Sequence, residues 1–149
     1  MKNLSKPRAI ICDIDGTLAL PGLRNPFDYS CVIDDVPNLP IIGLLNTYII
    51  LDRENPEWQQ TEILLVTGRE DVCEQETKLW MEHNGVEYHK LFMRKKGDRR
   101  PDYILKNEIY KKHIKGKYTP LFVLEDRDQA VLFWRSIGLT CLQVAPGNF

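Results

Sequence analysis

Short apolar runs alternate along the chain with longer segments in which apolar residues recur at helical spacing. The runs predict five strands, each short and hydrophobic enough to be buried on both faces of a sheet. They cover residues 8–14, 62–67, 90–93, 120–125 and 140–145. Helical patterns fall between them, at residues 37–53, 70–86, 101–116 and 127–138. This alternation predicts an α/β fold in which helices flank a central parallel sheet.

Polar residues end three of the predicted strands, and ligands of parallel sheets bind at the carboxyl ends of the strands. We therefore expect these side chains to lie along one edge. The first two, Asp13 and Asp15, point the same way on an extended chain. Neighbouring carboxylates at the end of a buried strand are costly unless a cation or a reaction uses them. The complete set is Asp13 and Asp15 at the end of the first strand, Thr67 and Arg69 at the end of the second, and Glu125, Asp126 and Arg127 at the end of the fourth.

Two interpretations of the Asp13 and Asp15 pair are open at this point. The first is a solvated strand end that continues into an Asp-Gly turn. The second is a phosphoryl-transfer site, because clustered carboxylates suit Mg²⁺, one carboxylate attacks phosphorus and another moves the proton. Asp13 would then be the nucleophile and Asp15 the general acid/base. The cations available to neutralise a bound phosphate would be Arg24, Arg69, Lys106 and Arg127.

Other phosphate chemistries lack their sequence motifs. No cysteine is followed six places later by Arg, the spacing that cysteine phosphatases need. Gly116-Lys117 continues with Tyr118, so the sequence contains no nucleotide-binding P-loop. There is no G-x-S-x-G elbow, and the three histidines lack metal-ligand spacing.

Length and composition fit one domain over residues 1–149. The chain is 43% hydrophobic and 28% charged, with a formal net charge of −1, so attraction to phosphates must come from local clusters. Its four cysteines form no C-x-x-C pair, which favours reduced thiols in a cytosol-like compartment. The N-terminal residues contain no secretory pattern and no stretch is apolar enough to span a membrane. We therefore expect a cytoplasmic protein without a membrane partner.

Four short motifs together resemble those of haloacid dehalogenase (HAD) superfamily phosphatases: DIDGTLA, VTGRE, the lysine of DYILKNEIYKKHI, and LEDRDQ. Three longer stretches closely resemble the 3′-phosphatase domains of phage polynucleotide kinase/phosphatases: DIDGTLALPGLRNPFD, KGDRRPDYILKNEIYKKHI and DRDQAVLFWRSIGLTCLQVAPGNF. The resemblance implies a HAD-type Rossmann-like fold. It also implies Mg²⁺-dependent removal of 3′-phosphates from DNA or RNA ends, as in nucleic-acid end repair.

The resemblance implies roles for individual residues. Asp13 would form an aspartyl-phosphate and Asp15 would act as general acid/base. Thr67 would hydrogen-bond the transferring phosphoryl group, and Lys106 would offset its charge. Further polar positions of the family's site are matched by Arg24, Arg69 and Asp102.

The resemblance also implies a metal site. Mg²⁺ would be held by Asp13, Asp126 and the backbone carbonyl of Asp15. Glu125 departs from the pattern, because the phage enzymes have Asp there. Whether Glu125 binds the metal directly or through water stays open.

The substrate class depends on access to the site. About twenty residues separate Asp15 from the first helical pattern, and the basic run RKKGDRR at residues 94–100 is shorter, so neither stretch forms a large cap domain. An open site suits a nucleic-acid end, and the basic run is either a phosphate-backbone contact or a solvated loop. Two alternatives remain: a phosphatase for small molecules or for 3′- or 5′-mononucleotides, and a non-catalytic binding module. The sequence also leaves open a separate kinase or ligase partner, a homo-oligomer, and a preference for DNA or RNA.

Overall fold

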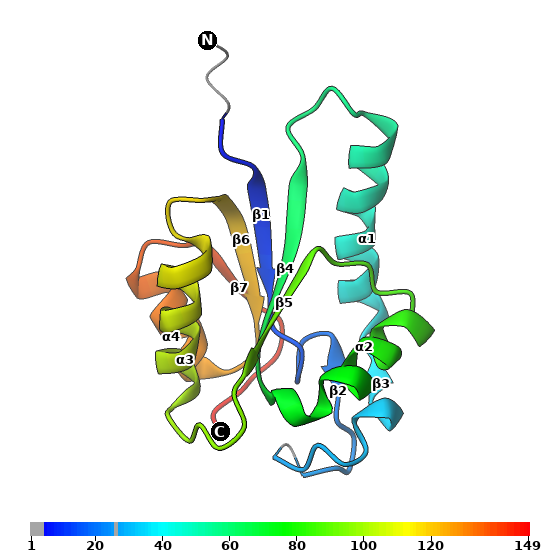
Figure 1. Ribbon diagram of the computed structural model, residues 1–149, viewed down its shortest axis with the longest axis vertical. Coiled ribbons are helices and arrows are strands. Elements are labelled where there is room, and N and C mark those ends of the chain that lie inside the picture. The colour runs from blue at the N-terminus through cyan, green and yellow to red at the C-terminus, as the bar shows by residue number, and fades with distance from the viewer. Residues whose placement is uncertain (1–4, 26) are drawn as a thin grey trace.

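The computed structural model describes residues 5–25 and 27–149, and its centre is a parallel sheet with strand order β5-β4-β1-β6-β7 (Figure 1). Every neighbouring pair of strands in this sheet is parallel. The α/β fold with a central parallel sheet is therefore confirmed. The strands are β1 (Arg8–Cys12), β4 (Thr61–Glu70), β5 (Lys90–Arg94), β6 (Thr119–Glu125) and β7 (Cys141–Gln143).

Helices cover both faces of the sheet, with α1 and α2 on one side and α3 and α4 on the other (Figure 1). A π-helical turn, Tyr110–Ile114, continues α3. Each helix coincides with one of the helical patterns in the sequence. Their bounds are α1 (Leu39–Glu54), α2 (Glu74–His83), α3 (Asp102–Ile109) and α4 (Asp128–Ser136).

The hydrophobic core divides into two layers because side chains of a strand point alternately to opposite faces. In β1, Ile10 and Cys12 join the apolar residues of α1 and α2. Ala9 and Ile11 join those of α3 and α4. All four residues are at most 1% exposed, so the sheet is buried on both faces, as its continuous apolar runs predict.

The first strand is shorter than predicted, ending at Cys12 instead of residue 14. The Asp13 N–H still donates to the Leu124 carbonyl at 3.0 Å, but the chain then turns away from the sheet. The Ile14 carbonyl accepts from the three successive N–H groups of residues 17–19, and Gly16 takes a φ of 77° that suits glycine. Asp13 is thus fixed to the sheet, whereas Asp15 belongs to the turn.

The second strand is longer than predicted, because β4 continues past Thr67 to Glu70. Its pairing with β5 is irregular between Val66 and Glu70 and resumes opposite Arg94. Thr67 therefore lies inside the strand instead of ending it, and Arg69 belongs to the strand as well. The third helical pattern also differs, because its α-helix ends at Ile109 and the π-helical turn follows.

The segment between Asp15 and α1 contains only short elements. Strands β2 (Ala19–Leu20) and β3 (Val36–Pro37) pair in antiparallel fashion, and a 3-10 turn spans Val32–Asp34. Within the described residues this segment forms no large cap, as expected. The expectation of one domain over residues 1–149 stays a prediction. Residues 1–4 and 26 lie outside the described range, so the prediction that the N-terminal residues contain no secretory signal falls partly on residues that the structure does not describe.

Two further predictions concern membrane-spanning segments and the cysteines. Among the described residues, no helix has the length and apolarity that a membrane crossing requires. All four cysteines are free.

Candidate active site

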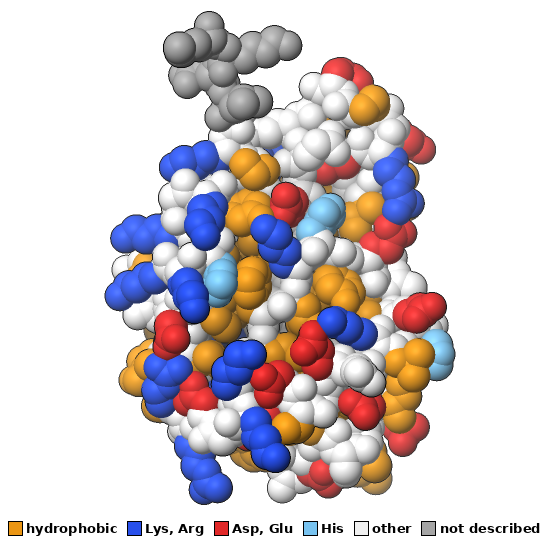
Figure 2. Space-filling view, in the orientation of Figure 1, with side chains coloured by type: hydrophobic (Ala, Val, Ile, Leu, Met, Phe, Trp, Pro, Cys, Tyr) orange, Lys and Arg blue, Asp and Glu red, His pale blue; other side chains and the backbone are white. Residues whose placement is uncertain are grey.

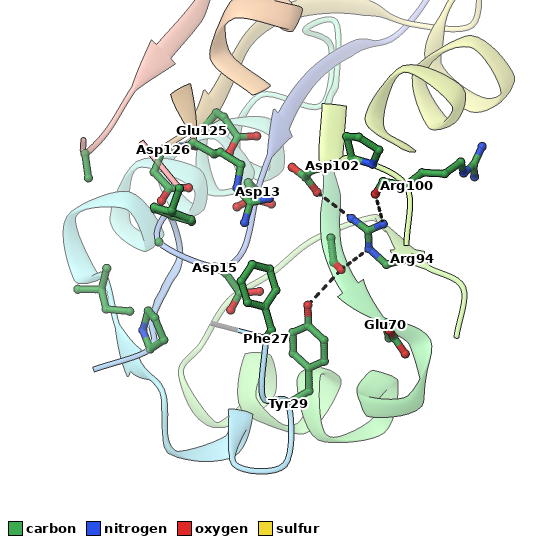
Figure 3. A pocket seen from close by; sticks show the side chains of 18 of the residues that line it. Asp13, Asp15, Phe27, Tyr29, Glu70, Arg94, Arg100, Asp102, Glu125 and Asp126 are labelled. Atoms are coloured by element: carbon green, nitrogen blue, oxygen red, sulfur yellow. Dashed lines mark hydrogen bonds and ion pairs between the residues drawn. The ribbon is translucent and has the colours of Figure 1, made fainter. Parts of the chain in front are cut away.

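A cavity of about 720 Å³ opens at the carboxyl ends of β1 and β6 (Figure 3). Its floor contains five acidic residues: Asp13, Asp15, Asp102, Glu125 and Asp126. These come from three segments that are far apart in the sequence, and the parallel sheet brings them to one edge, as the strand-end rule requires. Its rim includes Leu20, Phe27, Tyr29, Arg94, Arg99, Arg100, Arg127 and Phe149.

Lys106 lies at the centre of the buried carboxylates and is 1% exposed. Its Nζ is 3.1 Å from Asp13 Oδ1, 2.8 Å from Asp102 Oδ2 and 2.6 Å from Glu125 Oε2. Asp102 begins α3 and Lys106 follows one turn later, so both side chains share one helix face. Burial alone would lower the pKa of Lys106, but the three carboxylates raise it well above its ordinary value. The three carboxylates therefore favour the charged form of the ammonium beside Asp13.

Three of the carboxylates can hold a metal ion. One oxygen each from Asp13, Glu125 and Asp126 lies within 4.8 Å of the other two. Burial, followed by the charge of Glu125, raises the pKa of Asp126 to about 7. Burial also raises the pKa of Asp13 well above its usual range, with Glu125, Asp102 and Asp126 adding to the effect. The negative charges of these buried carboxylates repel one another. Such a set of carboxylate oxygens fits a hard divalent cation such as Mg²⁺.

Gly16 keeps the chain close to this cluster. A Cβ at this position would clash with the Asp126 carboxylate, and the φ of 77° is one that side chains rarely adopt. The glycine of DIDGT thus lets the turn after Asp15 pass directly over Asp126.

Asp15 lies in a second, separate charge cluster. Arg69 makes a bidentate contact, with Nε 3.0 Å from Asp15 Oδ2 and Nη2 2.8 Å from Oδ1. Arg24 Nη2 lies 3.0 Å from the same Oδ1. Two guanidinium groups therefore orient the Asp15 carboxylate, whose side chain is 23% exposed towards the cavity.

Asp35 completes this second cluster, and sequence reasoning missed it. Its Oδ2 is 2.6 Å from Arg69 Nη2 and 2.9 Å from Arg24 Nη2, while Oδ1 accepts from Arg24 Nε at 2.9 Å. Its backbone carbonyl accepts from Trp80 Nε1 at 2.8 Å. Asp35 is 5% exposed and its neighbour Asp34 is exposed. Nothing in the local sequence distinguishes these two aspartates, because the difference arises only when the segment folds over Arg69.

The two aspartates of DIDGT have different charged partners. The premise of an extended chain at Asp13 and Asp15 is wrong, because β1 ends at Cys12, but both residues line the same cavity. Asp13 contacts Lys106, and Asp15 contacts Arg24 and Arg69. Each carboxylate thus has its own cations.

The other predicted residues surround this centre. Thr67 is fully buried, and its Oγ1 accepts from the Arg69 N–H at 3.1 Å. The guanidiniums of Arg24 and Arg69 contact carboxylates in this structure, so their role in binding substrate stays a prediction. Arg127 precedes α4 on the cavity rim, and its guanidinium lies 4.9 Å from the Phe149 ring centroid.

Arg94 is a further residue that sequence reasoning did not assign to the site. It donates to the carbonyls of Gly68 at 2.9 Å and Arg100 at 2.7 Å, and its Nη2 is 3.5 Å from Asp102 Oδ1 (Figure 3). Tyr29 donates to the same Gly68 carbonyl at 3.3 Å. Arg94 therefore holds the loop after β5 against β4, and the run RKKGDRR begins with a structural residue.

Some of the other cations of this basic run form ion pairs and others do not. Lys95 lies 3.2 Å from Asp71, and Arg100 lies 2.6 Å from Asp98 and 2.5 Å from Glu108. Within the described part of the chain, Lys96 and Arg99 have no carboxylate partner at ion-pair distance. Of these two, Arg99 lines the cavity.

Comparisons with known proteins agree with this geometry. The sequence model of the polynucleotide kinase PNKP phosphatase domain, of the HAD type, matches residues 7–149. A protein of Autographa californica nuclear polyhedrosis virus, provisionally named as a bifunctional polynucleotide kinase/RNA ligase, is 35% identical over 135 residues. That match covers 89% of this chain and 18% of the viral protein.

Solved structures give the same result. A chain in a structure of a Pnkp1/Rnl/Hen1 complex superposes with a TM-score of 0.88 at 34% identity, covering 99% of this chain and 49% of that chain. A chain in a structure of the Pnkp1/Rnl/Hen1 RNA repair complex gives the same score and identity, covering 99% and 45%. The chain thus spans half or less of these relatives. On the match over residues 7–149, it belongs to the family of HAD-type phosphatase domains of polynucleotide kinases.

Proposed function

We propose that the protein is a Mg²⁺-dependent phosphomonoesterase that removes 3′-phosphates from polynucleotide ends through an aspartyl-phosphate on Asp13. One observation carries the proposal. Asp13 opens on the cavity beside Lys106 and within the carboxylate cluster, while Asp15 opens on the same cavity from a different charge cluster. A nucleophile and an acid/base residue with separate surroundings are what a two-step phosphoryl transfer needs.

The residues that would hold Mg²⁺ are Asp13, Asp126 and the backbone carbonyl of Asp15, with Glu125 direct or through water. The three carboxylates fit such an ion, because their mutual repulsion and burial leave negative charge to be offset. When bound, Mg²⁺ neutralises charge on the phosphoryl oxygens.

In the first step, an Asp13 carboxylate oxygen attacks phosphorus and the bond from phosphorus to the 3′ oxygen breaks. The Asp15 carboxyl gives its proton to that leaving oxygen. Lys106 stays charged throughout and stabilises the phosphoryl group as it moves. Thr67 is proposed to donate its hydroxyl proton to the same group, because accepting from the Arg69 N–H leaves that proton free.

In the second step, water attacks phosphorus and the bond to Asp13 breaks. The Asp15 carboxylate takes a proton from that water, so inorganic phosphate leaves and both aspartates return to their starting states. Arg24 and Arg69 keep Asp15 at one position in both steps. Asp35 acts as a positioning residue, because it reaches Asp15 only through the two arginines.

The cavity rim supports a nucleotide as the group that carries the phosphate. Phe27 and Phe149 are 68% and 54% exposed, although large aromatic side chains are usually covered. Aromatic faces stack on nucleobases, and the Arg127 guanidinium lies against the Phe149 ring. Only short elements border the cavity on the β2 and β3 side, which leaves it accessible to a long strand.

Phosphate release tests this function. The substrates are an oligonucleotide with a 3′-phosphate, the same oligonucleotide with a 5′-phosphate, and a 3′-mononucleotide. We expect release from the first, with Mg²⁺ and not in excess chelator. Equal rates on the mononucleotide would favour the small-molecule alternative, and no release from any substrate would favour the binding module. The kinase and ligase named for the relatives suggest such partners for this chain, which co-purification would test.

A further inference from the structure

Positive charge is concentrated in one stretch of the chain. Residues 90–117 contain eleven Lys and Arg but three Asp and Glu, for a net charge of +8, whereas the remainder of the chain has a net charge of −9. This stretch forms β5, the following loop, α3 and the π-helical turn. Figure 2 shows Lys and Arg side chains gathered over the α3 and α4 side of the molecule. An almost neutral protein thus has one strongly basic side.

Several of these cations have no structural partner. Lys106 is buried, Arg94 binds carbonyls, and Lys95 and Arg100 are ion-paired. Lys90 and Lys117 are exposed but donate to the Tyr118 hydroxyl and the Lys112 carbonyl. Five others are exposed and, among the residues that the structure describes, lie beyond ion-pair distance of every carboxylate and donate no side-chain hydrogen bond. We name these five the α3 basic surface: Lys96, Arg99, Lys111, Lys112 and Lys115.

The α3 basic surface is continuous with the active-site cavity. Arg99 and Arg100 line the cavity, and Arg100 is paired with Glu108 on α3. Glu108 also lines a shallow depression together with Lys111 and Lys112. A nucleic-acid strand that leaves the cavity over Arg99 would therefore reach this depression next.

The spacing agrees with the phosphates of a nucleic-acid strand. Lys111 follows Asp102 by nine residues, which places it about 13 Å further along the helix axis. A stacked strand has one phosphate per about 3.4 Å, so this distance corresponds to about four nucleotides. A strand that runs from the cavity along α3 would therefore bring its phosphates past the cations of the depression.

His113 is a natural reporter of the local potential. Its ring stacks on Phe92 with centroids 4.8 Å apart. Burial lowers the pKa of His113, and the charges of Lys112, Lys117 and Lys90 lower it further. Anionic phosphates bound near these lysines would raise it again.

We propose that the α3 basic surface binds the phosphate backbone of the strand whose 3′ end occupies the cavity, from about the fourth nucleotide inwards. This inference rests on the proposed function for the position of the 3′ end. It adds a strand-binding surface that lies outside the catalytic residues and that makes long strands better substrates than short ones.

The test variant neutralises three exposed cations: Lys111→Gln, Lys112→Gln and Lys115→Gln. A matched control neutralises three exposed cations elsewhere: Lys6→Gln, Arg53→Gln and Lys78→Gln. Both lower the net charge by the same amount, so a non-specific charge effect would appear in both. Substrates are a 3′-phosphorylated dinucleotide and oligonucleotides of about four, eight and twelve nucleotides, spanning the length at which the surface is reached.

For the test variant we expect KM to rise only for strands longer than about four nucleotides, with kcat unchanged. Losing three phosphate contacts on a single strand should lower the slope of log K against log salt concentration by about 2. At about 0.1 M salt, this corresponds to a rise of roughly 100-fold in KM for the longest strand. Adding a long strand should raise the pKa of His113, followed by NMR, in the unmodified protein and not in the test variant. The control variant should resemble the unmodified protein in both measurements.

The outcomes separate this inference from the proposed function. Normal phosphate release with the same length and salt dependence in both variants overturns the inference alone. No release from any oligonucleotide by the unmodified protein overturns the proposed function, while anisotropy with a labelled strand and the His113 titration still report on the surface. Binding of polyglutamate as tight as that of an oligonucleotide of equal charge, and equally sensitive to the test variant, would overturn nucleic acid as the specific partner.

Discussion

Replacing Asp35 with asparagine removes one negative charge from a balanced buried group. Asp15 and Asp35 together offset Arg24 and Arg69, and the side chains of Asp35, Arg24 and Arg69 are 1%, 7% and 0% exposed. The substitution keeps the shape of the side chain but leaves two guanidiniums facing one carboxylate, away from solvent. We therefore expect Asp35→Asn to be strongly destabilising.

The magnitude follows from this burial. Removing one partner of a buried, hydrogen-bonded ion pair costs about 3–5 kcal/mol. For a chain of this size each kcal/mol lowers Tm by about 2–4 °C, so the expected loss is roughly 6–20 °C. Activity should fall by about 100-fold, since small displacements of a positioned acid/base residue have effects of that order. Asp34→Asn, at the exposed neighbouring position, is the matched control and should change neither property.

A second variant tests whether charge balance is the cause. Arg24→Gln combined with Asp35→Asn leaves Arg69 paired with Asp15, which retains the bidentate contact. The double variant should be more stable than the sum of the two single effects, by about 1–3 kcal/mol. Urea unfolding of the four proteins measures this coupling. Strictly additive effects, or a stable Asp35→Asn protein, would refute the reasoning.

Four further outcomes follow from the carboxylate cluster. Asp13→Asn should lower phosphate release by several orders of magnitude with an unchanged circular dichroism spectrum; near-normal turnover would exclude a covalent role. Excess chelator should abolish release and Ca²⁺ should restore it poorly, because Ca²⁺ prefers more ligands at longer distances; full activity in chelator would contradict this. Gly16→Ala should raise the Mg²⁺ concentration needed for half-maximal rate, because its Cβ displaces the Asp126 carboxylate; an unchanged requirement would argue against metal binding there. In chelator, Tm should fall as pH rises from about 4 to 7, because the raised pKa of Asp126 makes the folded state hold a proton that the unfolded state has lost. Mg²⁺ should raise Tm more at the upper end of this pH range than at the lower end. A Tm that does not change with pH would contradict this.

The sequence was sufficient for the sheet and for most of the carboxylate cluster. Buried parallel strands are continuous apolar runs, and the residues that follow them must meet at one edge, whatever the loops do. Asp13, Glu125 and Asp126 are therefore placed together by the topology alone. Lys106 was predictable as well, because a helix beginning at Asp102 directs residues one turn apart to the same face.

The second charge cluster was not predictable in the same way. It depends on where the chain leaves β1 and where β4 stops pairing, and both points differ from the apolar runs by two or three residues. Arg69 reaches Asp15 because β4 continues past Thr67. Asp35 reaches Arg69 because the segment before α1 folds back, and no periodic pattern records a contact of this kind.

The basic run shows a similar limit. RKKGDRR reads as a uniform positive segment, yet Arg94 faces inwards and Lys95 and Arg100 are ion-paired. Charge content is visible in a sequence, but charge available to a ligand depends on partners such as Asp71 and Glu108 that come from other segments.

The two charge clusters account for the spacing of the two aspartates in DIDGT. The cluster around Asp15 contains two arginines and two carboxylates and is balanced without any ion. The cluster around Asp13 contains four carboxylates but only two contacting cations, so full ionisation leaves two negative charges that a divalent cation would balance. Its members are Asp13, Asp102, Glu125 and Asp126, with Lys106 and Arg94. A two-residue separation across a turn is thus enough to place the proposed nucleophile, Asp13, where a cation is needed and the proposed acid/base residue, Asp15, where protein cations alone balance the charge.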